Sequence, residues 1–194
     1  LRRSEILPPR EERAGSRPVT ALFVGSICVR KGVHLLLEAW RKAGIDGRLK
    51  VVGRIDPGIR NLFDRLLEAD PTIEHVDFVS DLKPLYREAD LFILPSLEEG
   101  SPLVTYLALG ASLPMVVSPM GAGGVVEDGR EGFIVDPHDE GGLIDAMRRL
   151  ADSPELRREM GAAGGRMAPD YAWEEVATKR LEALLDRVPT TQAN

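Results

Sequence analysis

The sequence predicts an α/β fold in which a parallel sheet of about six strands is doubly wound, with helices on both faces. Three observations predict it. Short apolar runs alternate with segments of helical periodicity up to Pro137, the chain then becomes purely helical, and the first apolar run, VTALFVG, fits a buried parallel strand better than a one-sided antiparallel one. With 194 residues, 43% of them hydrophobic, the chain has the length of one ordinary domain with a substantial core.

Each predicted strand is a short apolar run that ends at a turn residue or a charge. The first, VTALFVG, ends at Gly25, and the fourth, DLFILPS, ends at a Pro-Ser pair. Such runs are typical of buried parallel strands, because a strand with one face in water alternates apolar and polar residues. The predicted strands are residues 19–25, 48–53, 75–80, 90–96, 113–119 and 132–137.

The predicted helices carry apolar residues three and four positions apart. After the first strand, Val33, Leu36 and Trp40 share one face, and Gly44 ends the segment. Pro84 is expected to interrupt the short third helix. The predicted helices are residues 30–44, 59–69, 82–89, 101–111, 140–153, 154–167 and 171–187. The last is amphipathic, and its apolar side consists of Trp173, Val176, Leu181, Leu184 and Leu185.

Charge, cysteine usage and hydropathy exclude several classes of protein. The chain has 25 Lys and Arg against 31 Asp and Glu, and this net charge of −6 argues against general nucleic-acid binding. The single cysteine, Cys28, cannot form an internal disulfide, which favours a reducing, cytoplasmic setting. No stretch approaches the roughly 18 consecutive apolar residues of a membrane helix, and the first residues are too charged for a signal peptide.

In such a sheet, ligands bind outside the carboxyl ends of the strands, so the loops that follow the strands are the candidate sites. The loop of residues 25–32 is bracketed by glycines and places Arg30 and Lys31 at the start of a helix. Cations there oppose the helix dipole, and a bound phosphate would explain them. The alternative is that both are solvated loop charges, since neither GxxxxGK[ST] nor GxGxxG is present.

The second candidate loop, residues 95–104, leads from a strand into a helix that Ser101 is expected to cap. Gly100 allows the backbone to approach a ligand closely, and backbone N–H groups beyond it can receive a phosphate oxygen. These donors belong to Ser101, Leu103 and Val104. A carboxylate of Glu98 or Glu99 beside such an anion can accept hydrogen bonds from sugar hydroxyls. The alternative is that both glutamates only complement the helix dipole.

The third loop, residues 118–132, is rich in glycine. Gly121, Gly123 and Gly124 make it conformationally permissive, and an Asp-Gly pair leads into the last strand. Because these features are equally typical of a surface turn, glycine density alone assigns no function to this loop.

Together these segments resemble the carboxyl-terminal domain of the group 1 retaining glycosyltransferases, whose two-domain architecture is called GT-B. The resemblance spans residues 19–187, in register. It implies that the chain forms a Rossmann-like three-layer sandwich, one half of a GT-B fold. The matching segments are FVGSICVRKGVHLLLEAW, LYREADLFILPSLEEGSPLV, LPMVVSPMGAGGVVEDGREGFIVDPHD and the closing RMAPDYAWEEVATKRLEALL.

The resemblance implies that this domain binds a nucleoside-diphosphate sugar, whose sugar is transferred to an acceptor with retention. Lys31 is expected to meet the diphosphate, beside Ser26, which stands where many members carry an arginine. Glu99 is expected to contact the transferred sugar as the catalytic residue. The backbone donors expected nearby are those of Gly100, Ser101, Leu103 and Val104. No metal or other cofactor is expected, because the three histidines, His34, His75 and His138, are scattered.

One position departs from the family pattern. The family's second glutamate falls eight residues after Glu99, where this chain has Leu107. In the family that carboxylate is expected to hold the ribose hydroxyls, and its loss would weaken donor binding roughly tenfold to a hundredfold. Thr105 or Tyr106 would compensate only if its hydroxyl pointed toward the site. The departure leaves open an alternative from another class, a degenerate non-catalytic GT-B module that acts as a scaffold or regulatory partner.

The resemblance also predicts the organisation of the chain. Residues 1–18 are interpreted as a linker from a missing amino-terminal domain that holds the acceptor, residues 19–187 as the donor-binding domain and residues 188–194 as a frayed tail. The domain alone is therefore expected to be inactive, and any contact with a membrane surface is expected through the missing domain. A nucleotide-sugar epimerase, a third interpretation, agrees less well with the EEGSPLV segment and the closing helix.

Overall fold

The computed structural model describes residues 1–8 and 18–186 and confirms the predicted fold class. Its strands are β1 (Val19–Val24), β2 (Gly47–Val52), β3 (Ile73–Val76), β4 (Leu91–Leu94), β5 (Met115–Val117) and β6 (Gly132–Ile134). They form one parallel sheet in the order β3-β2-β1-β4-β5-β6. All residues of β1 and β4 are buried, as their sequences predict, since Thr20 is the one polar residue of the two strands.

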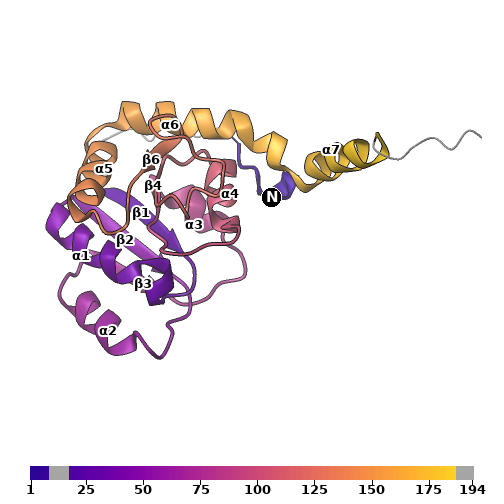
Figure 1. The fold of residues 1–194 in the computed structure, drawn as a ribbon. Coiled ribbons are helices and arrows are strands. Elements are labelled where there is room, and N and C mark those ends of the chain that lie inside the picture. The colour runs from indigo at the N-terminus through magenta and orange to yellow at the C-terminus, as the bar shows by residue number, and fades with distance from the viewer. Residues whose placement is uncertain (9–17, 187–194) are drawn as a thin grey trace, which may run out of the picture.

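The helices cover both faces of the sheet (Figure 1). They are α1 (Val33–Ala43), α2 (Arg60–Glu68), α3 (Lys83–Glu88), α4 (Leu103–Gly110), α5 (Glu140–Asp152), α6 (Pro154–Met167) and α7 (Trp173–Leu185), with 3-10 turns η1 (Arg3–Glu5), η2 (Val29–Lys31) and η3 (Ala168–Tyr171). One layer is built by α1 packing against α2 and α5, whereas α4 packs against α6. The face of α1 that carries Val33, Leu36 and Trp40 is buried, as its periodicity predicts.

The third strand lies earlier in the chain than the predicted residues 75–80. β3 pairs with β2 from Ile73, opposite Leu49, to Val76, opposite Val52. The pairing ends where β2 ends, so the following residues form a loop although their sequence alternates like a strand. In that loop the ring of Phe78 is 60% exposed, and the guanidinium of Arg54 lies 4.8 Å from its centroid.

Pro84 begins a helix instead of interrupting one. It lies in the first turn of α3, where a missing N–H removes no intrahelical hydrogen bond. The Asp81 carboxylate accepts a hydrogen bond of 3.1 Å from the N–H of Lys83 and so fixes the start of the helix. The predicted interruption is therefore wrong, and the proline explains where α3 starts.

Gly32 brings two loops at the carboxyl end of the sheet into direct contact. It lies between η2 and α1 with a φ of 65°, and a Cβ at this position would stand 2.0 Å from the carbonyl oxygen of Pro95. Only glycine fits, both because of the left-handed backbone and because of the neighbouring carbonyl. The loop after β1 thus lies against the loop after β4.

The first residues of the chain pack on the domain. Leu1 is 6% exposed, and its carbonyl accepts a hydrogen bond of 2.8 Å from the N–H of Trp173. The N–H of Leu7 donates to the carbonyl of Gly110, at the end of α4, over 2.8 Å. Residues 9–17 and the predicted tail lie outside the described residues, so a linker over residues 1–18 stays a prediction.

The closing helix α7 extends away from the body of the domain (Figure 1). On its predicted apolar side, Trp173 is 55% and Leu184 63% exposed. Leu181 and Leu185 are exposed as well. Within the described residues, Val176 is the one member of this side that is half-buried, so most of the side is exposed to solvent.

Replacing Gly32 by alanine should destabilise the fold more than the same change at Gly44. Both glycines have left-handed backbones, but a Cβ at Gly44 would meet nothing within 4 Å. Gly44→Ala therefore carries only the conformational cost of about 1–2 kcal/mol. Gly32→Ala should cost about 1–3 kcal/mol more because Pro95 must move. Urea unfolding of both variants measures the difference, and equal losses of stability would contradict the packing argument.

Candidate functional site

The candidate site lies where the order of strands reverses. The chain proceeds from β1 outward through β2 to β3, then returns to β4 on the other side of β1. At such a switch point the loops that follow the two central strands diverge and leave a crevice at the carboxyl ends of the strands. Residues 25–32 follow β1 and residues 95–102 follow β4, so two of the predicted loops meet here.

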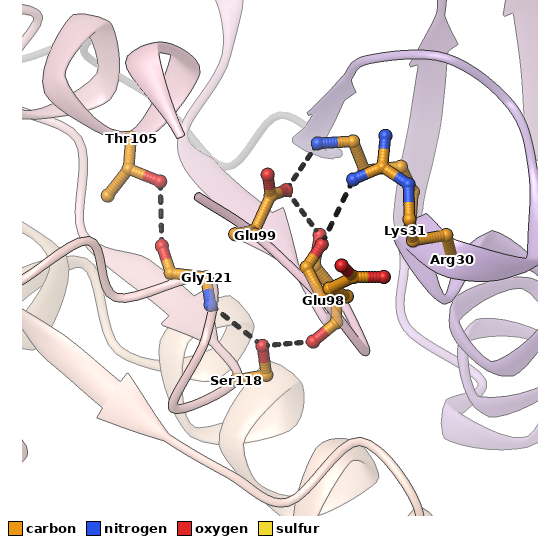
Figure 2. Close-up of polar contacts among 8 residues, drawn as sticks. Arg30, Lys31, Glu98, Glu99, Thr105, Ser118 and Gly121 are labelled. Carbon is orange, nitrogen blue, oxygen red and sulfur yellow. Dashed lines mark hydrogen bonds and ion pairs between the residues drawn. The ribbon is translucent and has the colours of Figure 1, made fainter. Parts of the chain in front are cut away.

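An ion pair joins these two loops. Lys31 Nζ donates to Glu99 Oε1, and the two side chains are only 13% and 5% exposed (Figure 2). Backbone groups join the same loops, since the N–H of Leu97 donates to the carbonyl of Arg30 over 2.8 Å. The Arg30 guanidinium also reaches the carbonyl of Glu98 at 3.3 Å. The structure thus brings together the two charged residues that the resemblance to the group 1 glycosyltransferases assigns to the diphosphate and to the sugar.

The Lys31–Glu99 pair lies close to the positive end of a helix. Lys31 lies two residues before α1, whose amino terminus has no side-chain cap. A cation there is unfavourable beside the positive end of the helix dipole, and Glu99 offsets it. Two largely buried charges are costly to desolvate and are stable only as partners.

A chain of buried hydroxyl groups extends from Glu99 to the glycine-rich loop (Figure 2). Ser96 Oγ donates to Glu99 Oε1 over 2.8 Å, and Ser118 Oγ donates to the carbonyl of Ser96 over 2.5 Å. The N–H of Gly121 donates to Ser118 Oγ, and Thr105 Oγ1 donates to the carbonyl of Gly121 over 2.8 Å. All three hydroxyl residues are fully buried. They fix the loops after β4 and β5 relative to α4.

This network was missed from the sequence. Ser96 and Ser118 lie at the ends of predicted strands, beside prolines, and such serines are common turn residues. Ser118 Oγ donates to the backbone carbonyl of Ser96, 22 residues earlier, and no local pattern identifies such a partner. Ser96 Oγ donates to the carboxylate of Glu99, only three residues later. The only sequence signal is that a polar residue directly follows an apolar strand at the edge where ligands bind.

The remaining predicted residues surround the ion pair. Ser26 is exposed at the end of β1, and Gly100 and Ser101 are exposed in the loop before α4. α4 begins with Leu103 and Val104, and the first N–H groups of a helix have no intrahelical partner. The predicted cap by Ser101 is wrong, because the residue before the helix is Pro102 and no side chain caps it.

At position 107 of α4, leucine stands where the family pattern has its second glutamate. The hydroxyl groups of the neighbouring Thr105 and Tyr106 do not replace that carboxylate. Thr105 donates to the glycine-rich loop, and Tyr106 Oη donates to the carbonyl of Gly123 over 3.0 Å. Both hydroxyls therefore bind the glycine-rich loop and not a ligand. Leu107 is half-buried and lines a cavity on the α3 side of α4.

Within residues 1–8 and 18–186, no three His, Cys, Asp or Glu side chains are grouped closely enough to hold a metal ion. None of the helices described is long and apolar enough to cross a membrane.

Comparison with known proteins identifies relatives of the whole domain. The family described as "Glycosyl transferases group 1" matches residues 18–153. The chain is 31% identical over 176 residues to D-inositol 3-phosphate glycosyltransferase of Pseudarthrobacter chlorophenolicus, covering 84% of this chain and 41% of that protein. It is 32% identical over 188 residues to glycogen synthase of Mycobacterium tuberculosis, covering 91% and 44%. The chain thus spans less than half the length of these relatives.

Solved structures have the same fold. Sucrose-phosphate synthase from Thermosynechococcus elongatus superimposes with a TM-score of 0.76 at 25% identity, over 87% of this chain and 45% of that one. Anabaena Alr3699/HepE in complex with UDP gives a TM-score of 0.80 at 17% identity, over 87% and 49%. The carboxyl-terminal domain of a group 1 glycosyl transferase from Francisella tularensis gives 0.73 at 21% identity, over 80% and 87%. The chain belongs to the group 1 glycosyltransferases, and its Rossmann-like fold is that of the carboxyl-terminal domain of a GT-B enzyme.

Proposed function

We propose that this chain is the donor-binding domain of a retaining glycosyltransferase and that its donor is a nucleoside-diphosphate sugar. The observation that carries the proposal is the buried Lys31–Glu99 pair at the switch point of the sheet, beside the amino terminus of α4. A cation and unpaired backbone N–H groups suit a diphosphate, whereas a carboxylate suits sugar hydroxyls. The structure of HepE, which shares the fold, contains UDP, and this agrees with the proposal.

In this proposal the donor exchanges partners with the ion pair. The diphosphate takes Lys31 away from Glu99 and also binds the first N–H groups of α4. Glu99, still oriented by Ser96, then accepts hydrogen bonds from the sugar. When the bond from the anomeric carbon to the diphosphate oxygen breaks, negative charge grows on the leaving diphosphate. Lys31 and the helix amino terminus are already placed to stabilise that charge.

The proposal also assigns the binding of the acceptor and the completion of the reaction. Because the chain spans 41% and 44% of its two relatives, we infer that the acceptor is bound by a part of the enzyme beyond this chain. The domain would then bind donor without transferring sugar. The scaffold alternative predicts that no nucleoside diphosphate binds, so binding distinguishes the two.

The first test is Lys31→Ala, with binding of UDP, GDP and ADP measured by calorimetry. Loss of a charged hydrogen bond should weaken the preferred nucleotide about tenfold to a hundredfold. Lys42→Ala is the matched control, because Lys42 is also paired with a glutamate but is 47% exposed at the far end of α1. Lys31→Ala/Glu99→Gln removes the buried unpaired charge, so weak binding in this folded double variant excludes unfolding as the cause. Unchanged affinity would contradict the role of Lys31.

A second test separates the sugar from the diphosphate. Glu99→Gln should remove most of the affinity that the sugar adds, because a neutral amide is a weaker acceptor for hydroxyls than a carboxylate. Affinity for the nucleoside diphosphate alone should stay the same or rise, since Lys31 loses its internal partner. Calorimetry with the nucleotide and with its sugar gives both values. An equal decrease for the two ligands would place Glu99 outside the sugar site.

A further inference from the structure

A cavity of about 210 Å³ lies between the amino-terminal segment, the loop before α3 and α4. Tyr86 and Leu107 give it apolar walls, and Glu5, Ser80 and Asp81 add polar groups. Ligand sites for complete small molecules usually measure about 300–1,000 Å³. This cavity is therefore suited to one part of a nucleotide sugar and not to the whole molecule.

The cavity begins close to the proposed diphosphate site. Leu107 lies four residues after Leu103, which places it about 6 Å along the helix from the amino terminus of α4. Tyr86, which also lines the cavity, donates through its hydroxyl to the carbonyl of Val104 over 3.0 Å, so α3 is tied to the first turn of α4. A nucleoside attached to a diphosphate at this helix terminus can therefore reach the cavity.

The amino-terminal segment holds Glu5 in the cavity wall. A hydrogen bond joins Leu7 to Gly110, and a Cβ at Gly110 would stand 3.2 Å from both the carbonyl oxygen of Glu5 and the side chain of Leu1. The segment is thus packed directly on the end of α4. Glu5 Oε2 accepts a hydrogen bond of 2.6 Å from the N–H of Arg2, which orients the carboxylate. A carboxylate has about four acceptor sites, so further hydrogen bonds can be accepted.

We propose that Glu5 accepts hydrogen bonds from the ribose hydroxyls of the donor, so that the amino-terminal segment completes the nucleoside site. Leu107 offers no acceptor from α4, and Glu5 lines the same cavity. The cavity lining contains two carboxylates, Glu5 and Asp81, and each already accepts one backbone hydrogen bond. Glu5 is the one carried by the segment that packs on α4. This inference rests on the proposed function, because it takes the diphosphate to lie at the amino terminus of α4.

The test compares Glu5→Gln with the unmodified chain, using whichever of UDP, GDP and ADP binds best and its 2′,3′-dideoxy form. Glutamine keeps the shape of the side chain and can still accept from Arg2, but the charge is lost. Affinity for the ribose nucleotide should fall about tenfold, whereas affinity for the dideoxy nucleotide should not change. Glu155→Gln is the control, because the Glu155 side chain is 84% exposed on α6. It should change neither the affinity for the ribose nucleotide nor that for the dideoxy nucleotide. Adding Leu107→Glu to Glu5→Gln should restore binding of the ribose nucleotide.

Two results would overturn the inference. Unchanged affinity in Glu5→Gln would show that the carboxylate does not contact the donor. Equal weakening of both nucleotides would show that Glu5 supports the fold and not the ribose. If binding depends on Lys31 but not on Glu5, only this inference fails. If no nucleoside diphosphate binds the unmodified chain, the proposed function fails with it.

Discussion

The structure of the site depends on one buried ion pair. Lys31 and Glu99 come from loops 68 residues apart in sequence, and each charge is stable in the crevice only because the other is present. Gly32 permits their contact, because any larger residue would push the loop after β1 away from Pro95. The three residues therefore depend on one another. Gly32 allows the two loops to approach closely, and this approach brings the opposite charges of Lys31 and Glu99 into contact.

The hydroxyl network extends this unit into the core. Buried hydroxyl groups stabilise a fold only when their hydrogen bonds are made, and Ser96, Thr105 and Ser118 each make one to a loop of the site. The loops after β4 and β5 are consequently held by specific hydrogen bonds as well as by apolar packing. The network orients the carboxylate of Glu99, which in the proposed function releases Lys31 to the diphosphate.

Much of this architecture could be predicted from the sequence, because its signals are local. Apolar runs such as Leu91–Leu94 indicate buried parallel strands, and the position of Lys31 and Glu99 after two of them places both at the ligand-binding edge. Other features depend on tertiary structure. The end of β3 at Val76 is set by the length of β2, and the cavity beside Glu5 is created by packing of the first residues on α4. The periodicity of apolar residues along the chain does not predict such contacts between segments that are distant in sequence.

The central claim, that the crevice of the Lys31–Glu99 pair binds a nucleoside diphosphate, is tested most directly by thermal unfolding of the unmodified chain with UDP, GDP and ADP. A ligand that binds only the folded state adds about 2.7 kcal/mol of stability at a hundredfold excess over its dissociation constant. The account predicts that at least one of the three raises the unfolding temperature, with one base preferred. Identical unfolding temperatures with and without every nucleotide, up to millimolar concentrations, would contradict it.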